Sequence, residues 1–138
     1  MGRLIDTTEV IAVERRTTSP ADAATQIGLL ASGAFIAAIQ VAELALGMHL
    51  ADSPARATHR RTVLNELLRV ATLIPLGEIE AREVARLQAL LRRMGTPIGD
   101  RDLQIAATAL VHGHEVLTRN VKDFAKIPGL IVIDAAPG

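Results

Sequence analysis

Three acidic residues interrupt apolar stretches of this 138-residue chain. Asp6 follows Leu4-Ile5, Glu43 lies within Val41–Leu46, and Asp102 extends the apolar face of a helix that includes Ile105 and Ala106. Carboxylates that meet in one place repel each other, and their pKa values rise unless a cation is present. Oxygen ligands alone select hard ions such as Mg²⁺ or Mn²⁺, which suit phosphodiester hydrolysis.

Each acid also has an ordinary structural explanation. Asp6 could cap a helix by accepting backbone N–H groups, and Glu43 could lie on a solvated edge or pair with one arginine. Asp102 could complement a helix dipole, although Asp100 suits that role better because it follows Gly99 and is the expected N-cap. A functional interpretation therefore depends on the acids meeting at one site.

A further polar cluster, Thr118–Phe124, follows an expected strand. Asn120 or Asp123 could supply a fourth oxygen ligand, or both could simply form a turn. Arg119 lies beside the expected site and is the best candidate for a contact to substrate. The pairs Arg15-Arg16, Arg60-Arg61 and Arg92-Arg93 could form a basic rim for RNA phosphates, or belong to solvated helix faces.

The elements that must position these residues alternate between strand and helix. Apolar runs predict strands at residues 3–6, 34–39, 72–76, 115–118 and 130–133, with helices between them. We therefore expect an α/β fold of three layers, in which helices flank a central, mainly parallel twisted sheet of about five strands. Ligands of such sheets bind outside the carboxyl ends of the strands, where the polar residues above are expected.

Composition limits the other functions. The chain is 49% hydrophobic with no net charge, which indicates one globular domain over residues 1–138 and argues against a general nucleic-acid coating protein. It has no cysteine, which excludes disulfides and thiolate zinc sites, and no Trp or Tyr to stack on bases. No signal peptide or membrane span is expected, so we predict a cytoplasmic protein.

With these residues assembled, the chain resembles the PIN-domain family, specifically its VapC-type toxins. The resemblance runs from Leu4 to about Asp134 and is carried by four motifs in order. They are Leu4-Ile5-Asp6-Thr7-Thr8, Ile39-Gln40-Val41-Ala42-Glu43-Leu44 with Gly47, Asp102-Leu103-Gln104-Ile105-Ala106-Ala107, and Thr118-Arg119-Asn120 with Asp123-Phe124 and Ile127-Pro128-Gly129-Leu130.

The resemblance implies a PIN-like fold and a Mg²⁺-dependent endoribonuclease, with Mn²⁺ as an alternative ion, that cuts tRNA, rRNA or mRNA. It also implies a homodimer and a cognate VapB-type antitoxin that inserts into the active-site groove. The implied catalytic acids are Asp6, Glu43, Asp102 and Asp123, the implied metal ligands Asp6, Glu43, Asp102 and Asn120, and the implied substrate-binding residues Thr7, Thr118 and Arg119.

Three positions depart from the family pattern: Thr8 stands where many relatives have Asn, Gln40 where Thr or Ser is usual, and the neutral Asn120 where some relatives have Asp. The departures at Thr8 and Gln40 leave open an alternative, a catalytically weak PIN domain that only binds an antitoxin or RNA. A receiver-like signalling module is a third hypothesis, but the expected third strand ends in Pro75-Leu76 without the aspartate that phosphotransfer requires.

Overall fold

A computed structural model describes residues 1–136 as an α/β fold whose helices flank one sheet. The strands are β1 (Arg3–Ile5), β2 (Phe35–Ala37), β3 (Thr72–Ile74), β4 (Glu115–Thr118) and β5 (Val132–Asp134). The helices are α1 (Thr7–Arg16), α2 (Pro20–Ala31), α3 (Ala38–His49), α4 (Pro54–Val70), α5 (Glu78–Arg93), α6 (Asp100–His112) and α7 (Val121–Phe124). Among these residues, no helix is both long and apolar enough to cross a membrane.

The five strands lie in the order β3-β2-β1-β4-β5, and all neighbouring pairs are parallel. The chain builds outward from β1 through β2 to β3, and then crosses to the other side of β1 to add β4 and β5. The strand order thus reverses beside β1. In open parallel sheets, a ligand site forms at the carboxyl ends of the strands at such a reversal.

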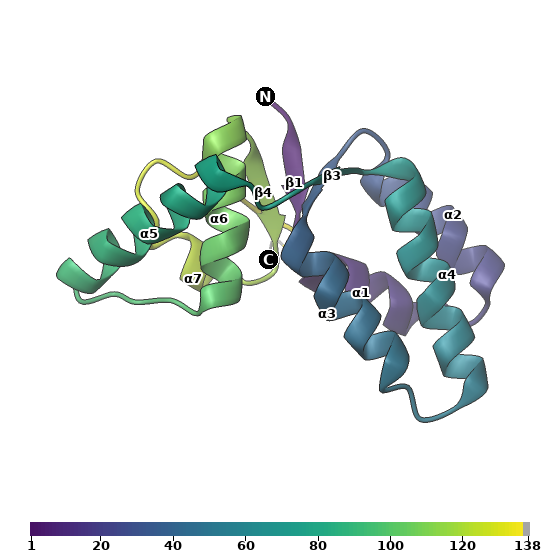
Figure 1. Ribbon diagram of the computed structural model, residues 1–138. Helices are drawn as coiled ribbons and strands as arrows, with labels where there is room; N and C mark the ends of the chain where they lie inside the picture. The colour runs from purple at the N-terminus through teal and green to yellow at the C-terminus, as the bar shows by residue number, and fades with distance from the viewer. Residues whose placement is uncertain (137–138) are drawn as a thin grey trace.

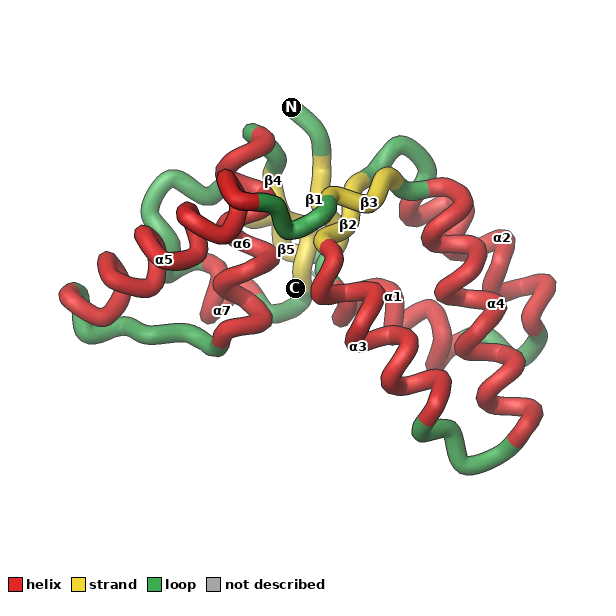
Figure 2. The backbone as a smooth tube through the Cα atoms, viewed as in Figure 1, coloured by secondary structure: helices red, strands yellow, loops and turns green. Residues whose placement is uncertain are grey.

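Helices cover both faces of the sheet, as expected for three layers. Figures 1 and 2 show α5, α6 and α7 on one side of the strands and α1 to α4 on the other. Side chains of β1 alternate between the two cores: Leu4 packs with residues of α5 and α6, whereas Ile5 packs with residues of α1, α2 and α4. Both side chains are fully buried, which explains the uninterrupted apolar sequence of this strand.

The start of α6 differs from the expectation, because Gly99, rather than Asp100, is its N-cap residue. Asp6 is the N-cap residue of α1: it has extended backbone dihedrals and accepts the N–H of Thr7. Ser19 and Ser53 are the N-cap residues of α2 and α4, and each of these helices has proline at its first position.

Candidate active site

Asp6 lies at the carboxyl end of β1, at the centre of the sheet, and its side chain is fully buried. Its Oδ1 accepts the backbone N–H of Thr7 at 2.8 Å, and its Oδ2 accepts the hydroxyl groups of Thr8 at 2.9 Å and Thr118 at 2.7 Å. The guanidinium of Arg101 donates to Oδ1 from 2.8 Å. Asp6 therefore caps α1 and also belongs to a polar cluster, so its two suggested roles coexist.

Glu43 and Asp102 reach the same guanidinium from two other helices. Glu43, on α3, accepts Nε of Arg101 through Oε2 and the hydroxyl of Thr7 through Oε1, the latter at 3.1 Å. Asp102, in the first turn of α6, accepts Nη1 of Arg101. The three carboxylates come from residues 6, 43 and 102 and meet around one cation, as the sequence pattern predicts.

Burial and charge act on the protonation of this cluster. Burial raises the pKa of Asp102; the charge of Arg101 opposes this rise, and the charges of Asp6 and Asp123 add to it. Burial lowers the pKa of Arg101, but the charges of Asp6 and Glu43 outweigh it and hold that pKa above its usual value. The site thus concentrates negative charge that favours a bound cation.

Threonine hydroxyl groups hold the carboxylates in place. Thr7 and Thr118, both implied as substrate-binding residues, are buried and face the acids: Thr7 donates to Glu43 and Thr118 to Asp6. Thr8 donates to Asp6 and accepts the backbone N–H of Arg119 at 3.3 Å. Threonine at position 8 therefore still serves the site, although many relatives have asparagine there.

Asn120 and Asp123 lie at the outer side of the cluster, in the turn after β4 and in the short helix α7. The amide of Asn120 donates to Asp102 at 3.3 Å and to Asp123 at 3.2 Å. Asp123 also pairs with Lys126 at 3.3 Å. The Asn120 hydrogen bond, followed by the nearby lysines, lowers the pKa of Asp123. Asp123 thus connects to the three central acids through Asn120 and does not contact Arg101.

Arg119 lies beside the cluster but has a partner of its own. Its Nε donates to Glu9, whose side chain is almost fully buried at the start of α1. The Arg119 side chain is 43% exposed, so one edge of its guanidinium faces solvent next to the acids. This position is compatible with the expected contact to substrate.

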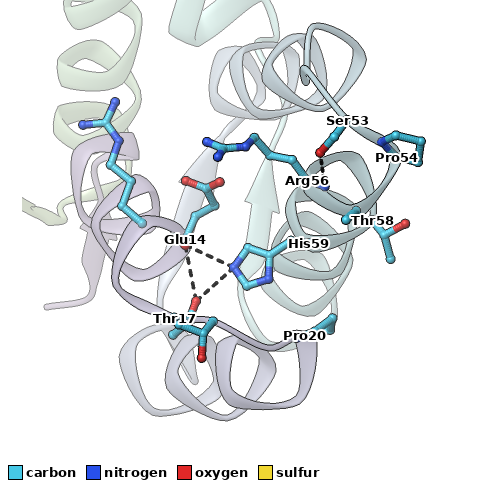
Figure 3. A pocket seen from close by; sticks show the side chains of 11 residues that line it. Glu14, Thr17, Pro20, Ser53, Pro54, Arg56, Thr58 and His59 are labelled. Carbon is cyan, nitrogen blue, oxygen red and sulfur yellow. Dashed lines mark hydrogen bonds between the residues drawn. The ribbon is translucent and has the colours of Figure 1, made fainter.

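A groove leads away from Glu43 along α1, α3 and α4. Next to the acid, a small cavity of about 180 Å³ is lined by residues that include Ile11, Arg15 and Arg60. A larger cavity of about 690 Å³ follows and shares Glu14 and Arg15 with the first. Figure 3 shows this second cavity, with His59 bonded to Thr17 and to the backbone of Glu14 at its inner wall.

Two residues of the site were missed by sequence reasoning. Arg101 had a usable signal: a cation in the first turn of a helix is unfavourable unless nearby acids compensate. Gln40 was noted only as a departure from the family. Its fully buried amide accepts the N–H of Ala37 at 2.7 Å and donates to the carbonyl of Ile5 at 2.6 Å, which ties the start of α3 to the end of β1.

The donor set fits a hard divalent ion, although the acids are not yet gathered as metal ligands. Within residues 1–136, no three acidic or imidazole side chains are close enough together to bind one ion as they stand. The guanidinium of Arg101 lies between the carboxylates instead. The chemistry of the donors, which are oxygens alone, is that of a Mg²⁺ or Mn²⁺ site.

Comparison with known proteins identifies the family. The PIN domain model matches residues 3–130. Ribonuclease VapC1 of Rickettsia felis is 34% identical and Ribonuclease VapC of Rickettsia bellii 33% identical, each over 96% of both chains. The solved structure of DNA-bound VapBC from Salmonella typhimurium matches with a TM-score of 0.80 and 25% identity, over 99% of both chains.

The match extends along nearly the whole chain, and the fold and the order of the acids agree with it. The chain therefore belongs to the PIN-domain family and, within it, to the VapC ribonucleases.

Proposed function

We propose that this chain is a Mg²⁺-dependent endoribonuclease and the toxin of a VapBC-type toxin–antitoxin pair. The observation that carries the proposal is the meeting of Asp6, Glu43 and Asp102 around one cation at the carboxyl end of the central strand. The VapC relatives support RNA as the substrate. The VapBC structure that this chain resembles supports a VapB-type antitoxin as the partner.

Asp6, Glu43 and Asp102 would hold the ion, and Asn120 or Asp123 would complete its ligands. When bound, Mg²⁺ activates water and stabilises the charge that develops on the phosphate. The chain's own contribution is orientation. Thr8 and Thr118 both donate to Oδ2 of Asp6, the start of α1 fixes Oδ1, and Thr7 donates to Oε1 of Glu43. Three carboxylate oxygens are thereby held on rigid elements, as an efficient metal site requires.

Exposed arginines would bind the RNA backbone. Arg119 lies beside the acids, and Arg15 lines both cavities of the groove that begins at Glu43. Thr7, Ile11 and Arg15 share one face of α1, which places Arg15 about 12 Å from the site along the helix. The chain has only two aromatic residues, Phe35 and Phe124, so its grip on RNA would use phosphates more than base stacking.

We also propose that the chain is a single domain and that it forms a homodimer in the cytoplasm. The support for the homodimer is an apolar surface that continues from the edge strand β3 into α5. Leu73, Leu76 and Ile79 are exposed there, with Ile79 at 68%. Exposed apolar side chains that gather on one surface are typical of protein interfaces.

The test of this function is the metal dependence of RNA cleavage. Purified protein, free of antitoxin and treated with EDTA, should leave a mixture of tRNA, rRNA and mRNA intact. Adding Mg²⁺ or Mn²⁺ should restore cleavage, whereas Ca²⁺, which is larger and accepts irregular geometry, should restore little. RNA or antitoxin binding without cleavage under any of these ions would instead favour the catalytically weak binding module.

Replacing Arg15 with alanine should weaken RNA binding several-fold and lower its salt dependence. One phosphate contact to single-stranded RNA contributes about 0.7 to the slope of log K against log salt, so the slope should fall by about that amount. Fluorescence anisotropy in an Asp6→Asn background would measure both quantities without cleavage.

Arg16→Ala is the matched control, because Arg16 binds Gln26 of α2 at 2.7 Å and does not line the groove. Equal losses from the two substitutions would mean that the groove does not carry the RNA strand.

A further inference from the structure

Arg101 forms an unusual set of contacts for a single side chain. Its three nitrogens donate to three carboxylates from three elements: Nη2 to Asp6 after β1, Nε to Glu43 on α3, and Nη1 to Asp102 on α6. The Arg101 side chain is 30% exposed, whereas the Asp6 side chain that it contacts is fully buried. The fork of the guanidinium thus occupies the space between the acids.

This placement opposes the local preference of the helix. Arg101 is the second residue of α6, where the positive end of the helix dipole disfavours a cation. The three carboxylates supply the compensation. Without the guanidinium they would face each other across a partly buried space, which costs free energy through repulsion and desolvation. Among residues 1–136, Arg101 is the one cation that forms ion pairs with these three carboxylates, and it therefore neutralises their charge in the absence of metal.

We propose that Arg101 is a positioning residue that holds Asp6, Glu43 and Asp102 together before metal binds and that a divalent cation must displace. This inference rests on the proposed function, because it assumes that the same carboxylates bind the ion. Both cations need the same oxygens: Oδ1 of Asp6, Oε2 of Glu43 and Oδ1 of Asp102 all accept from Arg101. Metal binding therefore includes the free energy of breaking these ion pairs, and Arg101 sets how tightly the site holds metal.

Removing the competing cation should tighten metal binding. Arg101→Met keeps a long apolar stem without the charge, and should bind Mn²⁺ about tenfold more tightly than the wild type, within the usual range of coupling between two sites. Titration calorimetry with Mn²⁺ alone measures this ratio. Arg101→Lys keeps the charge but has one donor nitrogen in place of three. Its affinity for Mn²⁺ should therefore lie between those of the wild type and Arg101→Met.

Thermal stability provides a second measurement. Its dependence on Mn²⁺ would not be expected if Arg101 had only a structural role. In EDTA, Arg101→Met should unfold at a lower temperature than the wild type, because the acids have lost their counter-ion. In saturating Mn²⁺ that difference should largely disappear, since the ion then neutralises the carboxylates in both proteins. Arg82→Met is the control: Arg82 pairs with Glu78 on the exposed face of α5, with both side chains 79% exposed. That variant should match the wild type in both conditions.

The outcomes separate this inference from the proposed function. If the wild type binds Mn²⁺ but Arg101→Met binds it equally or more weakly, Arg101 does not compete with the ion, so the inference is wrong and the metal site remains. If neither protein binds Mn²⁺ at millimolar concentration, the proposed function fails and the inference fails with it. Should Arg101→Met not fold, the Nε resonance of Arg101 in wild-type protein decides: it should shift as Mg²⁺ is added, and a resonance unchanged at metal saturation would overturn the exchange.

Discussion

Replacing Asp6 with asparagine is expected to lower RNA cleavage at least about a thousandfold, which corresponds to about 4 kcal/mol of transition-state stabilisation. Asp6 is the acid at the centre of the site, and it receives donors from α1, from Thr118 and from Arg101. Asparagine removes the negative charge that a divalent ion needs. Because it keeps one acceptor oxygen and caps helices as well as aspartate does, α1 should still form.

Asp22→Asn is the matched control, since Asp22 also lies near a helix N-terminus, in the first turn of α2, but is exposed. Its cleavage rate should equal that of the wild type. Initial rates on a fluorescent RNA, together with circular dichroism, would separate lost chemistry from lost structure. A folded Asp6→Asn protein that cleaves within about tenfold of the wild type would show that Asp6 is not a ligand of the catalytic ion.

Gln40→Leu is expected to destabilise the protein by about 2 to 4 kcal/mol, because it leaves buried polar groups without partners. The Gln40 side chain is fully buried and satisfies the N–H of Ala37 and the carbonyl of Ile5. Leucine has a similar volume but neither group. Urea unfolding of the two proteins measures the difference in free energy of unfolding.

The same substitution should also impair the site, since Gln40 Nε2 reaches the Thr7 hydroxyl at 3.3 Å and Thr7 orients Glu43. Gln88→Leu, at a partly exposed position of α5, is the control and should change stability by no more than about 0.5 kcal/mol. Equal stability of Gln40→Leu and the wild type would mean that this buried network contributes little to the fold.

Much of the fold could be predicted because its signals are local and repeated. The apolar run at Leu4-Ile5 and the Ser-Pro pairs before α2 and α4 each specify an element with a physical reason. The residues at which the strands end could be predicted less accurately. The expected strand 34–39 is shortened to Phe35–Ala37, because α3 begins at Ala38 and Gln40 bonds back to Ala37. The sequence does not mark this boundary, because the apolar run continues past Ala37 to Ile39.

The site could be predicted only in part. The three acids stood out because each interrupts an apolar stretch, and the sheet order brings them to one place. Their roles as metal ligands stay a prediction, as does the choice between Asn120 and Asp123. The partner of the acids, Arg101, was missed because a charged residue beside another at a helix start is common on solvated surfaces. Its signal, a cation in the first turn of a helix, becomes specific only once the acids of distant elements are placed around it.

The departures from the family pattern at Thr8 and Gln40 have a structural explanation. Thr8 donates to Asp6, and Gln40 joins β1 to α3 while reaching Thr7. Both residues support the carboxylates rather than obstruct them. The departures therefore give no structural reason to prefer the catalytically weak module over the nuclease.

We expect the carboxylates of Asp6, Glu43 and Asp102 to share one divalent ion. Anomalous diffraction from crystals of the protein grown with Mn²⁺ would test this directly. It should show a single strong peak about 2.0 to 2.4 Å from carboxylate oxygens of all three residues, with the Arg101 guanidinium moved away. A peak elsewhere, or none at saturating Mn²⁺ with Arg101 still between the acids, would contradict it.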